Sequence, residues 1–285
     1  MGVPTGSPPL EGEDKGGGAQ LAPRKRTRLA VMRRAPTQPP QGGGRYLSGI
    51  APSYDLEEVV FAPVAPAVEK LRDAFFESIG RLTFGLVQAR RWSFWVGPLL
   101  MLEFGDPRPH GHGWRWPIRR GLLTRAAAGE FGFEWRDGRL LGNVNEYRPA
   151  MPEPAYGLLQ LPVHRHVTRL FLLWVRGRAP APGVPAEPAL RLAAGAADLL
   201  LCALIARRRG LPALLALTAA YHAGLWAIGG RTPGAYLFGQ RVVAVDGTRA
   251  APGQALLRLA TVPLALYRRR ALHDELAGTE VIKVR

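Results

Sequence analysis

The residue that most constrains function is Asp198, because it lies in the middle of an apolar run, Leu192–Ala206, that carries no other formal charge. An unpaired charge at the centre of a membrane helix costs about 2.5–3.5 kcal/mol on insertion scales. We therefore expect Asp198 to face a partner inside a helical bundle or to be protonated. The candidate partners are His222, Arg258 and the Arg268–Arg270 cluster. Two interpretations follow: an ion- or proton-linked transport step, or a buried ion pair or hydrogen bond that sets helix packing.

A second set of charges brackets this run. Arg191 precedes Asp198 by seven residues, so two helical turns place both side chains on one helix face. Far along the chain, a basic cluster is followed by His273, Asp274 and a Gly-Thr turn. The stretch from Arg191 to Thr279 therefore holds the charged residues that could act within one helical module.

Other residues could do chemistry, but their spacing does not assemble a site. Two residues apart on a helix, His164 and His166 do not share a face, and His110 and His112 lie in a Pro/Gly loop, so no metal is expected. No nucleophile elbow, phosphate loop or zinc-protease pattern is present, which predicts a non-enzymatic protein without a cofactor. Tryptophans could line a pocket for an apolar ligand, or could simply be core; these are Trp92, Trp95, Trp114 and Trp116.

Three apolar segments must position the charges. Leu192–Ala206 would be about 22 Å long as a helix, short of a hydrocarbon core near 30 Å unless it extends back to Ala189. Leu211–Ile228 is a better spanning candidate, and the four residues between the two runs allow only a hairpin. The third segment, Gln254–Tyr267, is interrupted by Pro263 and is expected to lie at the interface or to re-enter. The competing interpretation is a soluble domain with fully buried helices.

The order of these features resembles the RDD family of small membrane proteins, which is named after one arginine and two aspartates. Matching motif to motif, these residues fall on Arg191, Asp198 and Asp274. The resemblance also rests on RTPG from Arg231, an RVV…DG segment, an arginine in the third helix and a closing HDELAGT. It covers about 190–282, roughly a third of the chain. The resemblance implies a membrane module, with an ion-transport role only suggested for the family.

Composition divides the rest of the chain. The formal charge of +16 suits nucleic acid or an anionic membrane surface, and no nucleic-acid-binding module accompanies it. Residues 1–44 are expected to be a disordered basic tail, whose charge cluster is either solvated or in contact with anionic head groups. An α+β domain is predicted for 45–178, a proline-rich linker for 179–190 and the RDD-like module for 191–285. The fold class is thus multi-domain: α+β, then an all-α membrane module consisting of a helical hairpin and a short third helix.

Within the α+β domain, residues 65–80 have the apolar spacing of a helix, as does Leu161–Val175. Strands are predicted over 81–88, 90–105 and 129–147 from their aromatic and β-branched content. Asp137-Gly138 indicates a hairpin turn in the last of these, because both residues accept a positive φ.

Taken together, the sequence predicts an integral membrane protein of RDD type, related to ion or solute transport or acting as a membrane-bound accessory. Its expected partners are membrane lipids and an ion or small solute. The alternative is an α+β domain that binds a lipid or small apolar ligand and is tethered by the hairpin. Loop arginines favour both ends of the hairpin, and hence both termini, on the cytoplasmic side of a bacterial inner membrane.

Overall fold

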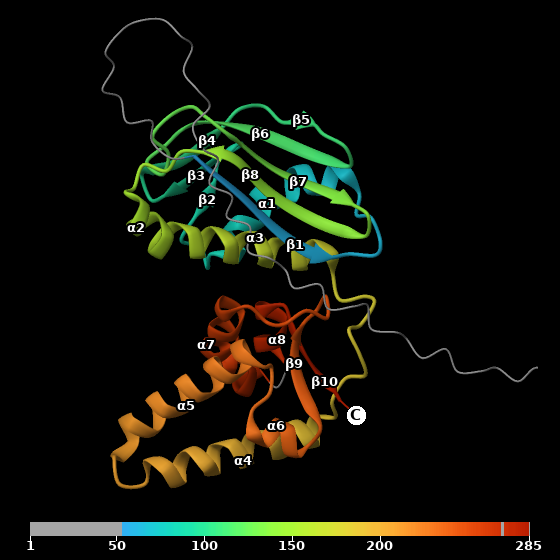
Figure 1. Cartoon of the computed structure of the whole chain (residues 1–285), viewed down its shortest axis with the longest axis vertical. Coiled ribbons are helices and arrows are strands. Elements are labelled where there is room, and N and C mark those ends of the chain that lie inside the picture. Colours follow the sequence, from blue (N-terminus) through green and yellow to red (C-terminus); the bar gives the residue numbers. More distant parts are fainter. Residues whose placement is uncertain (1–52, 269–270, 285) are drawn as a thin grey trace, which may run out of the picture. The chain divides into compact units, whose positions relative to one another are not determined.

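The computed structural model describes residues 53–268 and 271–284 (Figure 1). The basic tail expected over 1–44 lies outside these residues, as does most of the Arg268–Arg270 cluster. The described residues belong to one compact unit, so the predicted division into separate domains is not confirmed.

The first part of the chain forms an eight-stranded antiparallel sheet with a long helix against it (Figure 1). Seven strands follow the spatial order β1-β8-β7-β6-β4-β3-β2, and β5 pairs with β6. The strands are β1 (Tyr54–Phe61), β2 (Gln88–Ala89), β3 (Ser93–Val96), β4 (Leu99–Phe104), β5 (Arg108–Pro109), β6 (Gly113–Arg120), β7 (Glu130–Arg136) and β8 (Arg139–Tyr147). The predicted α+β character of this region is confirmed.

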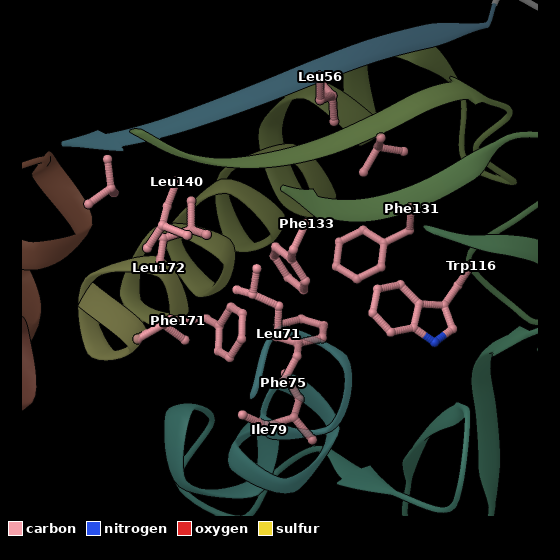
Figure 2. Packing of buried hydrophobic residues seen from close by; sticks show 14 of the residues in the cluster. Leu56, Leu71, Phe75, Ile79, Trp116, Phe131, Phe133, Leu140, Phe171 and Leu172 are labelled. Atoms are coloured by element: carbon pink, nitrogen blue, oxygen red, sulfur yellow. The ribbon is translucent and has the colours of Figure 1, made fainter. Parts of the chain in front are cut away.

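Helices α1 (Val68–Leu82) and α3 (Leu161–Arg176) pack against the sheet and against each other. The short α2 (Glu153–Ala155) and a π-helical turn, Tyr156–Gln160, lead into α3. Aromatic rings fill the space between the helices and the sheet: Phe75 of α1 packs against Phe133 of β7 and Phe171 of α3, with ring centroids 4.9 Å apart in both pairs (Figure 2). These ring contacts join both helices to the sheet in one aromatic core.

Local patterns predicted some of these elements and misplaced others. The Asp137-Gly138 turn between β7 and β8 is confirmed, with φ values of 51° and 73°. The strand predicted over 81–88 is wrong, because α1 continues to Leu82 and only Gln88 begins a strand. Residues 90–105 hold two strands, since Gly97 turns the chain between β3 and β4.

The second part of the chain combines helices with a small sheet. Two helices, α4 (Pro188–Ala206) and α5 (Gly210–Ile228), form a hairpin, and both are long and apolar enough to cross a membrane (Figure 1). They are followed by α6 (Pro233–Leu237), β9 (Gln240–Ala244), α7 (Pro252–Arg268), α8 (Leu272–Ala277) and β10 (Thr279–Lys283). The prediction of an all-α module is wrong, because β9 and β10 pair antiparallel.

Two further boundaries differ from the predictions. Helix α4 begins at Pro188, inside the expected linker, because proline at the first turn gives up only an N–H that has no helical partner. Helix α7 continues through Pro263 instead of being interrupted there. It packs on α5 and α8, so neighbouring elements support the turn in which proline removes a backbone hydrogen bond.

Candidate functional site

Asp274 is the centre of a buried charge cluster, which we call the Asp274 centre. Its side chain is 4% exposed, and its Oδ2 accepts a hydrogen bond from Arg191 Nη2 at 2.5 Å. Its Oδ1 accepts from Arg258 Nη1 and, at 3.0 Å, from the hydroxyl of Thr279. One carboxylate therefore joins α4, α7 and α8 through two ion pairs.

The chain around Asp274 explains the spacing of its motif. Asp274 lies in the first turn of α8, where a carboxylate is favoured by the helix dipole. Gly278 ends the helix in the left-handed region, at φ 59°, which a glycine adopts without steric cost. The next residue, Thr279, starts β10 and returns its hydroxyl to the aspartate. The HDELAGT sequence thus forms a short helix that ends at Gly278, and the following Thr279 donates a hydrogen bond to Asp274 in the first turn of that helix.

Arg258 is held on two sides. Its Nη1 contacts Asp274 and also donates to the Thr279 hydroxyl at 3.0 Å, while its guanidinium lies over the ring of Trp226, 4.8 Å from the centroid. The two arginines exceed the single carboxylate by one charge. Burial, followed by the charges of Arg258 and Arg191, lowers the pKa of His273 to about 4, so its imidazole is neutral at physiological pH.

Asp198 forms a second, separate cluster, the Asp198 centre, in the middle of α4. Its side chain is 4% exposed. Its Oδ1 accepts from the Tyr221 hydroxyl at 2.6 Å and from the Gly234 N–H at 2.8 Å, and its Oδ2 accepts from the Thr232 hydroxyl at 2.5 Å. His222 Nε2 lies 3.9 Å from Oδ2. Asp198 thus accepts hydrogen bonds from the Gly234 N–H and the Thr232 hydroxyl at the start of α6, and these bonds connect α6 to the hairpin.

The Thr-Pro-Gly sequence fits this role residue by residue. Thr232 is the N-cap of α6, where its Oγ1 also accepts from the Ala235 N–H, and Pro233 takes the first helical position. At Gly234, a Cβ would lie 2.2 Å from the carbonyl oxygen of Ala194 in α4. Only glycine allows α6 and α4 to approach so closely.

The partners of Asp198 in the structure differ from the predicted ones. Of the predicted partners, Arg258 pairs with Asp274 instead, and His222 is near but outside hydrogen-bonding distance. Arg191 also turns to Asp274, although it shares a helix with Asp198. The three motif residues therefore belong to two clusters. The groups that donate hydrogen bonds to Asp198 are two hydroxyls and a backbone N–H, and the sequence did not predict them because they carry no charge.

The outward faces of helices α4 and α5 are apolar and exposed. Leu200 of α4 is 71% exposed and Leu211 of α5 is 65% exposed. The buried positions of α4 are Ala194, Asp198, Cys202 and Ala206. The two helices are therefore not fully buried within the described residues, in contrast to the competing interpretation, and exposed apolar surface of this kind marks an interaction site.

The four tryptophans of the predicted pocket pack against other residues of the chain. Trp116 is fully buried in the aromatic core, and its ring centroid lies 6.1 Å from that of Trp92. The indole N–H of Trp114 donates to the Val68 carbonyl. Trp95 lies beneath the guanidinium of Arg90. A cavity of about 260 Å³ does occur, but its lining includes Ser78, Leu170 and Trp174 and none of the four. This arrangement favours core packing over a ligand site.

The histidine pairs are not brought together by the fold. His164 lies edge-on to Phe131, and burial lowers its pKa to about 4. His110 lies beside Glu134, at 3.9 Å. Among the residues that the structure describes, no group of three or more potential metal ligands occurs.

One buried charge was not predicted as part of a site. Arg169 of α3 is 8% exposed and donates to Glu58 of β1 at 3.1 Å, to Gln254 of α7 at 3.0 Å and to the Thr248 hydroxyl at 2.7 Å. The only signal in the sequence is an arginine among apolar residues in a helix. Its three acceptors come from distant parts of the chain, so spacing could not identify them.

Comparisons with protein-family models, with curated proteins and with solved structures gave no match.

Proposed function

We propose that this chain is an integral membrane protein of RDD type whose α4–α5 hairpin crosses the bilayer. In this role it is a non-enzymatic, membrane-bound accessory. The observation that carries the proposal is the exposed apolar surface of two 19-residue helices, each about 28 Å long. That length matches a hydrocarbon core near 30 Å.

The accessory role, rather than transport, follows from how the motif charges are used. Both oxygens of Asp274 and both oxygens of Asp198 already accept hydrogen bonds from protein donors. Buried carboxylates with this many partners fix the packing of helices, and breaking such a pair is costly. Both ends of the hairpin lie on the cytoplasmic side of a bacterial inner membrane in this proposal, as the flanking arginines favour.

Carbonate extraction of membranes tests the spanning hairpin. The wild-type chain should stay in the pellet, and its release into the supernatant would refute the proposal. Leu199→Arg should weaken integration, because an arginine near the middle of the helix costs about 2.5–3.5 kcal/mol on insertion scales. The matched control is Leu99→Arg in β4, since Leu99 and Leu199 are both 52% exposed. The control should remain in the pellet.

A second candidate, ion- or proton-linked transport, rests on one observation. Asp198 and His222 are two titratable groups 3.9 Å apart in the middle of the hairpin. Proton- or ion-driven flux into vesicles should then be abolished by Asp198→Asn and retained by Asp73→Asn, a partly exposed aspartate in α1. Unchanged flux in a folded Asp198→Asn protein would remove this candidate.

A further inference from the structure

The tip of the hairpin concentrates positive charge. Arg207, Arg208 and Arg209 are consecutive and exposed, and they connect α4 to α5. The Arg209 N–H donates to the Ala206 carbonyl at 2.8 Å, and Gly210, at φ 79°, reverses the chain. Three guanidinium groups therefore project from one tight turn.

These charges have no counter-charge within reach along the chain. The sequence contains no Asp or Glu between Asp198 and Asp246. Among the described residues, no ion pair involves the three tip arginines, whereas Arg191 and Arg258 share Asp274. No carboxylate of the described residues pairs with the tip, so its three guanidinium groups are free to bind an anion of another molecule.

The position of the tip identifies that molecule. The tip lies at the end of two apolar helices whose length, about 28 Å, would carry it across the hydrocarbon core and into a head-group layer. The anions of that layer are lipid phosphates. A guanidinium binds a phosphate through two parallel N–H donors, which a point charge cannot do.

We propose that the Arg207–Arg209 turn binds the head groups of anionic phospholipids. The proposal rests on the spanning hairpin proposed above. Each basic residue near an anionic surface strengthens binding about fivefold, so three arginines together supply roughly 100-fold. Because the tip is exposed, its affinity falls as ionic strength rises.

The test compares two triple variants of the full-length protein in detergent micelles. The first replaces the tip: Arg207→Gln, Arg208→Gln and Arg209→Gln. The control removes the same charge from exposed arginines of the sheet region: Arg119→Gln, Arg125→Gln and Arg139→Gln. Each protein is titrated with short-chain phosphatidylglycerol, with phosphatidylcholine and with inorganic phosphate, and binding is measured by calorimetry. The circular dichroism spectrum and the melting temperature check that each variant is folded.

The tip variant should bind phosphatidylglycerol at least tenfold more weakly than wild type, while the control variant should bind it unchanged. Equal affinity of the tip variant and wild type would overturn the proposal, as would equal wild-type affinity for phosphatidylcholine. Wild-type binding of inorganic phosphate as tight as that of phosphatidylglycerol would assign the turn to free phosphate and would also overturn it. Carbonate extraction separates the two proposals: a wild-type chain that stays in the pellet while the tip variant keeps its lipid affinity removes only this inference.

Discussion

Replacing Asp274 by Asn removes the charge that two buried or partly buried arginines share. The substitution keeps the size and shape of the side chain. An asparagine still offers one acceptor oxygen, but its NH2 group would face the donors of Arg191 or Arg258. At least one guanidinium therefore loses its partner.

The magnitude follows from burial. Arg258 is 4% exposed and cannot turn to solvent, whereas the Arg191 side chain is 27% exposed and can. A single hydrogen bond to a charged group contributes about 1.5–3 kcal/mol. Removing one partner of a buried ion pair costs about 3–5 kcal/mol, because the remaining charge stays desolvated. We expect Asp274→Asn to lower the free energy of unfolding by about 3–5 kcal/mol.

The assay is denaturant unfolding of the full-length protein in mixed micelles, followed by circular dichroism. Asp73→Asn is the matched control, since Asp73 makes an ion pair with its neighbour Arg72 at the surface and should cost at most about 1 kcal/mol. Arg258→Met should also destabilise, by leaving the Asp274 carboxylate with fewer donors. The double variant Asp274→Asn/Arg258→Met should cost less than the two single changes added together, by about 1–3 kcal/mol. Additive losses, or an Asp274→Asn effect no larger than that of Asp73→Asn, would refute the reasoning.

Three further changes test other parts of the structure. Gly234→Ala places a Cβ 2.2 Å from the Ala194 carbonyl oxygen, so it should lower the free energy of unfolding by about 1–3 kcal/mol or more. The 229–239 segment should also become sensitive to protease. Unchanged stability and cleavage would contradict the close approach of α6 and α4. Arg169→Met should cost about 3–5 kcal/mol in the same unfolding assay, since the fully buried Asp246 carboxylate loses its ion pair with Arg169 at 3.8 Å; a loss below 1 kcal/mol would contradict the role of Arg169. His164 has a folded pKa near 4 against 6.5 when unfolded, so the unfolded state takes up its proton first as the pH falls. Stability should therefore be full above pH 6.5 and decline towards pH 4, by up to about 1.4 kcal/mol per pH unit, and His164→Gln should flatten this decline.

Local patterns in the sequence predicted the elements that depend on neighbouring residues alone. The helical spacing of residues 65–80 and of Leu161–Val175 predicted α1 and α3 closely, because each helix must bury one apolar face. The Asp137-Gly138 turn was predicted because its φ values depend on those two residues alone. Strand β2, by contrast, is two residues long and exists through its pairing with β3, which no local pattern records.

The sequence predicted that Asp198 has an internal partner, but it did not predict which groups are that partner. That Asp198 needs an internal partner follows from the cost of burying a charge, and the structure does bury it among hydrogen-bond donors. The identity of those donors depends on the chain returning after Gly229 and Gly230 to place α6 beside α4. Periodicity could place Arg191 and Asp198 on one face, but it could not assign them to different clusters.

The separation of the Asp274 and Asp198 centres limits how helix α4 can move. Helix α4 contributes one residue to each cluster: Arg191 joins it to α8, and Asp198 joins it to α6. Because the two contacts are two helical turns apart on one rigid helix, α4 cannot tilt or slide without breaking at least one of them. The Asp274 centre holds α4 through one ion pair between two full charges, whereas the Asp198 centre holds it through hydrogen bonds whose donors are neutral and individually weaker. Motion of the hairpin should therefore begin at Asp198 and pivot about Arg191. A spin label or cysteine probe on α6 should become mobile in an Asp198→Asn protein while a probe on α8 stays fixed; the reverse order would contradict the pivot.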